Sequence, residues 1–206
     1  RTLVCDAQVD LEQPWRTATL YELVSEAVRT NVDPGTPMAD LIALATAHDV
    51  ALQPGWSAGE IALELFEKLV EHTLIKPTFV KDYPVEARPL ARDHRDDPRL
   101  AEAWDLVIGG VELATGYSEL VDPVEQRRRL TEQSIKAAGG DPEAMQLDED
   151  FLRALEHGAP PMGGQGMVRD RLVRLVTGQP IRETNLFPLV KPHSWSFGFL
   201  FCFPVP

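Results

Sequence analysis

Two acidic residues flank a Gly-Gly pair in AWDLVIGGVELATGYSEL, which spans residues 103–120. If the Gly-Gly pair forms a two-residue hairpin turn, Val107 faces Glu112 and Asp105 faces Ala114. Asp105 and Glu112 then lie diagonally on one face of the sheet. Because Mg²⁺ in proteins typically takes one or two carboxylates together with substrate phosphates, this pair is a candidate magnesium site.

Three further polar residues of the same hairpin, Thr115, Tyr117 and Glu119, fall on the opposite parity of the strand. In a regular strand they would point away from Glu112. A β-bulge would bring both sets to one face, and bulges are common beside active sites. The alternative is that these side chains are simply solvated, as charged residues of an acidic protein usually are. Spacing alone does not choose between the two.

A second candidate is GGQGMVRDR, residues 163–171, which lies between a Pro-Pro turn and the apolar run LVRLV. Glycines let a backbone approach a ligand closely because they have no Cβ. The guanidinium of Arg171 is planar and permanently charged, which suits phosphate oxygens or the face of a purine. The stretch is therefore a phosphate cradle, a plain turn into a helix, or the remains of a nucleotide site.

Helix start and stop signals define the elements that would position these residues. Ser57 and Glu60 form a capping box before an apolar-periodic run, and Thr36-Pro37 places a cap and a first-turn proline before another. Asp122 is likewise a cap, followed by a first-turn proline, and the helix that it begins ends at Gly139-Gly140. The resulting predicted helices cover residues 38–48, 58–72, 123–138, 148–156 and 167–176.

Strand-like segments rich in β-branched and aromatic residues lie between these helices. They are VCDAQVDL, PTFVKDYP, AWDLVIG, VELATGYSEL and ETNLFPLV, at residues 4–11, 77–84, 103–109, 111–120 and 183–190. Runs of strands beside blocks of helices predict an α+β fold, an antiparallel sheet flanked by helices.

Composition limits the functional classes further. The 206 residues carry a net charge of −12, which argues against a broad nucleic-acid-binding face because phosphate binding draws on clustered Lys and Arg. Cys5 and Cys202 are too isolated to indicate a disulfide framework or a zinc site, and a reducing cytoplasmic location follows as the default. With no apolar run of about 18 residues, we expect no membrane span in this chain.

The chain resembles the C-terminal half of the catalytic domain of class II lysyl-tRNA synthetases. Three segments carry the resemblance in the same order: PTFVKDYPVEARPLA, GVELATGYSELVDPVEQRRRLTEQ and GMVRDRLVRLVTGQPIRETNLFPLVKP. It runs from Pro14-Trp15 to Lys191-Pro192. The resemblance implies an antiparallel sheet flanked by helices. It also implies activation of lysine by ATP to lysyl-adenylate, transfer to tRNA, and a homodimer in the complete enzyme.

For ATP, the resemblance implies that Arg171 clamps the nucleotide near its terminal phosphate. Asp105 and Glu112 would hold the Mg²⁺ that bridges the ATP phosphates. Gly164 and Gly166 would let the backbone approach the substrates. No nucleophilic side chain is required because the lysine carboxylate attacks the α-phosphate, so catalysis is orientation plus electrostatics.

For the amino acid, the resemblance implies that Glu119 receives the substrate ammonium, a charged pairing that discriminates against neutral side chains. Tyr117 would pack along the methylene stem of the lysine. Thr115 and Gly166 would complete the amino-acid site.

Two departures from the family pattern fall in the glycine-rich segment. Val168 stands where the family has glycine, and its β-branched side chain disfavours any positive φ there. Arg169 stands where the family has an apolar residue on the core side, where an unpaired charge is expensive to bury. From these departures we expect an impaired nucleotide site that Val168→Gly with Arg169→Ile would improve.

Four further departures lie around the hairpin. Thr115 replaces the usual asparagine, and Asp105 replaces the usual glutamate with a shorter reach. Ala103 stands where the family has arginine, and Arg88 where it has serine.

The resemblance also implies what the complete enzyme has before Arg1: an anticodon-binding barrel and the first two class II motifs. We therefore expect residues 1–192 to be part of a catalytic domain that is inactive by itself. The last segment, HSWSFGFLFCFPVP at residues 193–206, is an atypical apolar tail.

Two other readings stay open. One is a catalytically impaired synthetase-like relic or paralogue that acts as a binding module. The other is a related lysine ligase, such as those acting on elongation factor P or the actinobacterial membrane enzyme that fuses a synthetase module to a lipid-lysylating domain.

Overall fold

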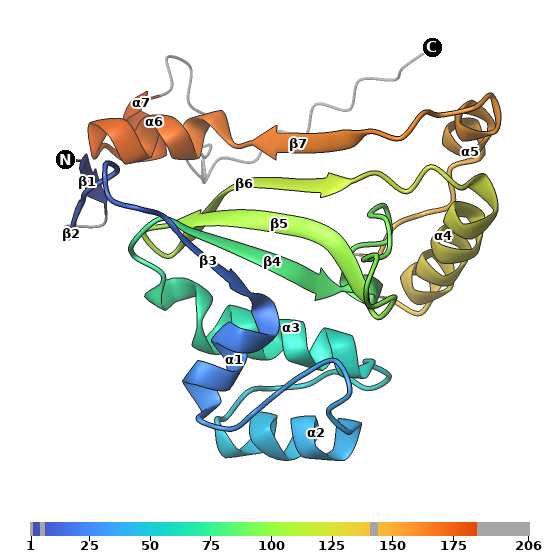
Figure 1. The fold of residues 1–206 in the computed structure, drawn as a ribbon, viewed down its shortest axis with the longest axis horizontal. Coiled ribbons are helices and arrows are strands. Elements are labelled where there is room, and N and C mark those ends of the chain that lie inside the picture. Colours follow the sequence, from blue (N-terminus) through green and yellow to red (C-terminus); the bar gives the residue numbers. More distant parts are fainter. Residues whose placement is uncertain (1, 5–6, 141–143, 185–206) are drawn as a thin grey trace, which may run out of the picture.

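A computed structural model describes residues 2–4, 7–140 and 144–184 (Figure 1). The expected tail at residues 193–206 lies outside the described residues, as do both cysteines. The fold is α+β, with one main sheet flanked by helices, as the sequence predicts.

The main sheet has five strands in the order β3-β4-β5-β6-β7. They are β3 (Arg16–Thr19), β4 (Thr78–Pro84), β5 (Leu100–Ile108), β6 (Val111–Ser118) and β7 (Gly163–Met167). All pairs are antiparallel except β3 and β4, which run parallel because a helical connection separates them in the chain. A separate antiparallel hairpin, β1 (Thr2–Val4) with β2 (Ala7–Val9), lies beside α6 (Arg169–Thr177).

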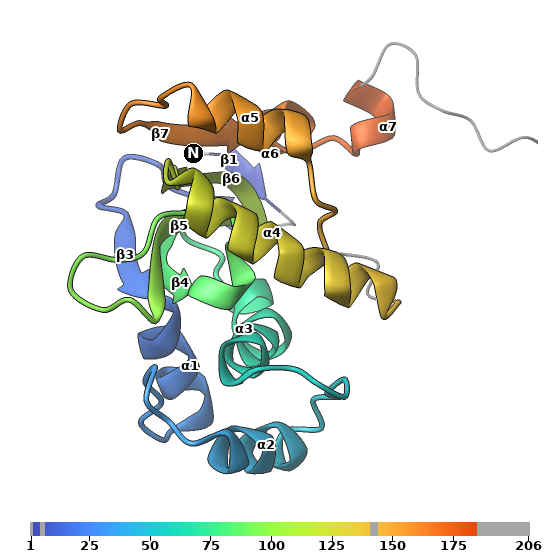
Figure 2. The same ribbon diagram turned by 90° about the vertical axis from the view of Figure 1, so that its right-hand side faces the viewer.

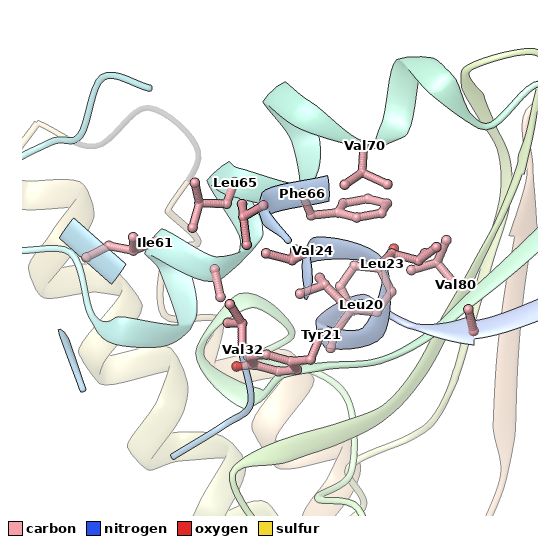
Figure 3. Close-up of a cluster of buried hydrophobic side chains, with 14 of the residues drawn as sticks. Leu20, Tyr21, Leu23, Val24, Val32, Ile61, Leu65, Phe66, Val70 and Val80 are labelled. Carbon is pink, nitrogen blue, oxygen red and sulfur yellow. The ribbon is translucent and has the colours of Figure 1, made fainter. Parts of the chain in front are cut away.

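A helical layer covers one face of the sheet (Figures 1 and 2). It consists of α1 (Leu20–Val28), α2 (Met38–Ala47) and α3 (Ala58–Leu69). Figure 3 shows the apolar core in which α1 and α3 meet, where Leu20, Val24 and Leu65 are completely buried. The core extends to Val80 and Val107 on the sheet, so the layer is fixed to the strands that carry the hairpin.

A second apolar cluster lies on the opposite face of the sheet. It joins Leu106 and Leu113 of the hairpin to Leu172 and Leu175 of α6. The other regular elements are the 3₁₀ turns η1 (Glu71–Thr73) and η2 (Val85–Ala87), and the helices α4 (Pro123–Ala138), α5 (Glu149–Glu156) and α7 (Ile181–Thr184).

The helix caps read from the sequence are largely confirmed. Ser57 and Glu60 form the predicted capping box, with each side chain accepting a hydrogen bond from the other residue's backbone N–H. Asp122 accepts from two backbone N–H groups at the start of α4. Thr36 is a correction: its hydroxyl accepts from the Asp33 N–H at 2.8 Å, so it stabilises the preceding loop instead of capping α2.

Several element boundaries differ from the sequence prediction. The single strand predicted at residues 4–11 is wrong, because β1 and β2 are two strands that pair with each other. The helix predicted at residues 58–72 ends at Leu69 and is followed by η1. The helix predicted from residue 167 begins at Arg169, because Met167 is still paired in β7. The sequence predicts a strand at residues 183–190, but Glu183 and Thr184 are helical and belong to α7. The rest of this prediction, from residue 185 onward, lies outside the described part of the chain. The elements β3 and α1 carry no prediction from the sequence, although Thr19 and Glu22 form a clear capping box.

A close approach between β5 and β6 gives a stability prediction. A Cβ built on Gly116 would lie 2.4 Å from Cζ2 of Trp104, whose ring packs edge-on against Phe79. We expect Gly116→Ala to lower the free energy of unfolding by about 1–3 kcal/mol through overpacking. Urea denaturation measures this. Gly163→Ala is the control, because its nearest neighbour would be a backbone oxygen at 3.5 Å; equal effects of the two changes would contradict the prediction.

Candidate functional site

A β-bulge shapes the hairpin of β5 and β6. Gly109 and Gly110 form the predicted two-residue turn, both at positive φ, and Val107 pairs with Glu112 as predicted. One step further the register shifts, so Asp105 pairs with Thr115 and not with Ala114. The expected pairing of Asp105 with Ala114 is therefore wrong, because one extra residue is inserted in β6.

The bulge brings the two sets of polar residues to one face of the sheet. Leu113 and Ala114 both join the apolar cluster on the far side. Glu112 and Thr115, which border them, consequently share the face that carries Asp105. Tyr117 follows on the same face. A bulge between Glu112 and Thr115 is the arrangement that a common site requires, and the structure contains it.

The two candidate metal ligands differ in burial. Asp105 is 4% exposed, and its Oδ1 has no hydrogen-bond partner among the described residues. Glu112 is half-buried. Burial raises the pKa of the Glu112 carboxyl, and the negative charges of Asp105 and Glu71 add to this, while Arg88 and Arg171 oppose it. Two carboxylates are the protein ligands that Mg²⁺ typically takes when it also binds phosphates, and one of them has an unpaired buried oxygen. No group of three or more possible metal ligands lies among the described residues.

The candidate lysine-binding residues continue along β6. Burial raises the pKa of the Glu119 carboxyl, and within the described residues its side chain has no ionic partner. Burial and the neighbouring Glu119 charge raise the pKa of Tyr117. A Cβ on Gly164 would lie 2.1 Å from Oε1 of Glu119. Glycine at 164 therefore makes room for the Glu119 carboxylate itself.

Arg171 approaches the bulge from α6, which packs on the other side of the sheet. The backbone N–H of Val168 donates to the Leu113 carbonyl at 3.0 Å, which ties the start of α6 to the bulge. Arg171 Nη1 then donates to the carbonyl oxygen of Glu112 at 2.5 Å. Two segments about 60 residues apart thus meet at one point, although the Arg171 side chain is only partly buried.

The structure corrects both expectations about the glycine-rich segment. Val168 has φ −80° and ψ 98°, so its backbone needs no glycine. The side chain of Arg169 is 87% exposed, so within the described residues it is not buried in the core. Strain at Val168 and a buried charge at Arg169 are therefore not reasons to expect an impaired site, and the impairment itself stays a prediction.

A cavity of about 850 Å³, which we call the central cavity, is lined by two of the predicted site residues, Thr115 and Tyr117. Thr115, Tyr117 and Arg88 line it on the sheet side, and Trp56 and Glu60 line it from the helical layer. Its volume lies within the range of small-molecule sites. Gly166 pairs with Thr115, and a Cβ there would lie 3.9 Å from the threonine methyl group, so the space beside Thr115 is open.

A hollow of about 830 Å³ lies mainly against the opposite face, around Trp104, Lys81 and Glu102. Of the predicted site residues, Tyr117 and Gly164 line it, and the predicted carboxylates and Arg171 are not among its lining residues. Its charged groups already pair, with Arg95 Nε 2.9 Å from Glu102 Oε1. The central cavity is therefore the better candidate.

Arg88 is a site residue for which sequence reasoning assigns no role. It follows η2, lines the central cavity and donates from Nη2 to Oδ2 of Asp105. Its charge also lowers the pKa of Glu112 and of Tyr117. The sequence indicates its importance only indirectly. The family pattern has serine where this chain has Arg88, and it has arginine where this chain has Ala103.

Comparison with known proteins identifies the family. The family described as tRNA synthetases class II (D, K and N) matches residues 2–191. The chain belongs to this family, and its α+β sheet with flanking helices agrees with that assignment.

Similar proteins are named lysylphosphatidylglycerol biosynthesis bifunctional protein LysX. The protein of Mycobacterium avium (strain 104) is 57% identical over 185 residues, which cover 90% of this chain and 16% of that protein. The protein of Nocardia farcinica is 56% identical over 184 residues, 89% of this chain and 16% of that protein. This chain thus spans a small part of the relatives it matches. No helix among the described residues is both long and apolar enough to cross a bilayer.

Proposed function

We propose that the chain forms the lysine- and ATP-binding floor of a domain that activates lysine with ATP. Asp105, Glu112 and Glu119 lie on one face of the sheet, and Arg171 bonds to the backbone carbonyl of Glu112; this arrangement supports the proposal. Each residue type suits its part: an unpaired carboxylate for an ammonium, two carboxylates for a metal, and a guanidinium for phosphate.

The amino acid enters with its side chain toward Glu119. A carboxylate that is partly desolvated and has no ionic partner gains most from a cation. Tyr117 lies between that carboxylate and the metal-binding pair, so it packs along the methylene stem. A neutral side chain in the same place leaves Glu119 unpaired, which gives the site its preference for lysine.

The reaction needs no group of the protein to bond covalently. A carboxylate oxygen of lysine forms a bond to the α-phosphorus of ATP, and the bond from that phosphorus to the bridging oxygen breaks to release pyrophosphate. Arg171 holds the phosphate end, and Asp105 with Glu112 would hold Mg²⁺, which neutralises charge on the phosphates. The residues of this chain contribute orientation and electrostatic stabilisation.

The relatives favour a related lysine ligase over a free-standing lysine–tRNA ligase. Their name assigns them to lysylphosphatidylglycerol biosynthesis and calls them bifunctional. In this proposal the activated lysine is used for lysylphosphatidylglycerol biosynthesis. The family resemblance implies that tRNA is the first acceptor of the lysine. The alternative of an impaired relic loses two of its reasons, because Val168 needs no positive φ and the Arg169 side chain is exposed.

Lysine binding tests the proposal. We expect Glu119→Gln to weaken lysine binding to the 206-residue chain about tenfold or more in isothermal titration calorimetry, because a charge-assisted hydrogen bond is worth about 1.5–3 kcal/mol. Glu102→Gln is the matched control, a carboxylate that pairs with Arg95 on the opposite face. Equal lysine affinity in the wild type and Glu119→Gln would refute the assignment.

A further inference from the structure

Arg88 and Asp105 form an ion pair inside the candidate site. Arg88 Nη2 donates to Oδ2 of Asp105, and the two side chains are 26% and 5% exposed. The guanidinium carbon also lies 4.2 Å from the ring centroid of Tyr83, which is buried. Arg88 is therefore held by a carboxylate on one side and by an aromatic face on the other.

The pair leaves polar atoms unsatisfied. Arg88 Nε and Asp105 Oδ1 are both buried without a hydrogen-bond partner among the described residues. Buried donors and acceptors are nearly always paired in native proteins. Because each side chain keeps one unpaired polar atom, either of them can leave the other and bind a ligand instead.

The position of Arg88 conflicts with metal binding. Its charge acts on Glu112 as well as on Asp105, so it partly neutralises both candidate metal ligands. A divalent cation between those carboxylates would lie next to a guanidinium, and like charges at such distances repel strongly. Arg88 can move away, because it lines the central cavity beside Thr115 and Tyr117.

We propose that Arg88 is an internal counter-ion that occupies Asp105 in the empty site and must turn into the central cavity before a divalent cation binds. The proposal rests on the proposed function, in which Asp105 and Glu112 are the metal ligands. Metal then binds only when the free energy gained from the two carboxylates exceeds the free energy of the Arg88–Asp105 ion pair. A serine at position 88 would remove this competition.

Direct metal titration tests the proposal without a reaction. Mn²⁺ is the probe, and electron paramagnetic resonance measures its free concentration against the 206-residue chain with and without ATP. We expect Arg88→Ser to bind Mn²⁺ about tenfold more tightly than the wild type, since a neighbouring charge commonly shifts such an equilibrium by a factor of ten or more. The double variant Arg88→Ser with Asp105→Asn should lose this gain.

Arg95→Ser is the matched control, because it removes the same charge from the other face of the sheet, where Arg95 pairs with Glu102. Its Mn²⁺ affinity should equal that of the wild type. Unchanged affinity in a folded Arg88→Ser variant, or an equal gain in Arg95→Ser, would overturn the proposal. Glu119-dependent lysine binding reports separately on the proposed function, so the two can fail independently.

A second measurement uses the wild-type chain and does not depend on how the variants fold. Phenylglyoxal modifies accessible guanidinium groups, and peptide mapping locates the modified arginine. We expect saturating Mn²⁺ to increase modification of Arg88 several-fold and to leave Arg95 unchanged. The counter-ion role is excluded if Mn²⁺ does not change the labelling of Arg88.

Discussion

Arg171→Ala is expected to weaken ATP binding about a hundredfold or more. A guanidinium that pairs with phosphate through two charge-assisted hydrogen bonds contributes about 1.5–3 kcal/mol for each. Its loss also frees the Glu112 carbonyl, to which Nη1 donates at 2.5 Å, and removes a positive charge beside two carboxylates. Equilibrium binding of a fluorescent ATP analogue, with competition by ATP, measures the change.

Arg169→Ala is the control for this prediction. It removes the same charge from the same helix, but its side chain is 87% exposed and lies 3.7 Å from the adjacent Asp170. We expect its ATP affinity to stay within a factor of about two of the wild type, since exposed ion pairs contribute little. Comparable losses in both variants would show that net charge, and not the position of Arg171, governs ATP binding.

Leu65→Ala is expected to lower the free energy of unfolding by about 2–5 kcal/mol, the usual range for truncating a buried leucine. Leu65 is 0% exposed in the core between α1 and α3 (Figure 3), next to the helix face that lines the central cavity. Leu65 belongs to the same buried cluster as Phe66 and Val24, so its truncation leaves a cavity in a packed core. Chemical denaturation monitored by circular dichroism measures the change.

Ile135→Ala provides the comparison, because Ile135 lies on α4 and is 68% exposed. We expect it to change stability by less than about 0.5 kcal/mol. A loss of less than 1 kcal/mol for Leu65→Ala would show that the helical layer is not packed cooperatively against the sheet.

Local signals predicted the helices well because caps act over three or four residues. The capping box at Ser57 and the Asp122 cap specify helix starts without help from the rest of the chain. Strands depend more on partners. β3 has four residues and no strong alternation, and it becomes a strand only because β4 lies beside it. The glycine-rich β7 likewise takes its extended form from pairing with β6.

The arrangement of the candidate site could be predicted only in part, because it too depends on how the strands pair. The Gly-Gly turn fixed the pairing of Val107 with Glu112, but the next pairs depended on a bulge. The sequence does contain a sign of it: Leu113 and Ala114 are two consecutive apolar residues between polar ones, which breaks the alternation of a regular strand. Nothing local indicates that Arg88 reaches Asp105, because that contact joins the turn after β4 to the neighbouring strand β5, 17 residues further along the chain.

The bulge also lets two consecutive apolar residues face the same side. If the same sequence paired without it, Ala114 would lie opposite Asp105, and Thr115, Tyr117 and Glu119 would point away from that carboxylate. Because of the bulge, Leu113 and Ala114 both pack toward α6, and the polar residues on either side of them stay on the face of Asp105. In related chains we therefore expect positions 113 and 114 both to remain apolar, whereas the size of the side chain at each can vary.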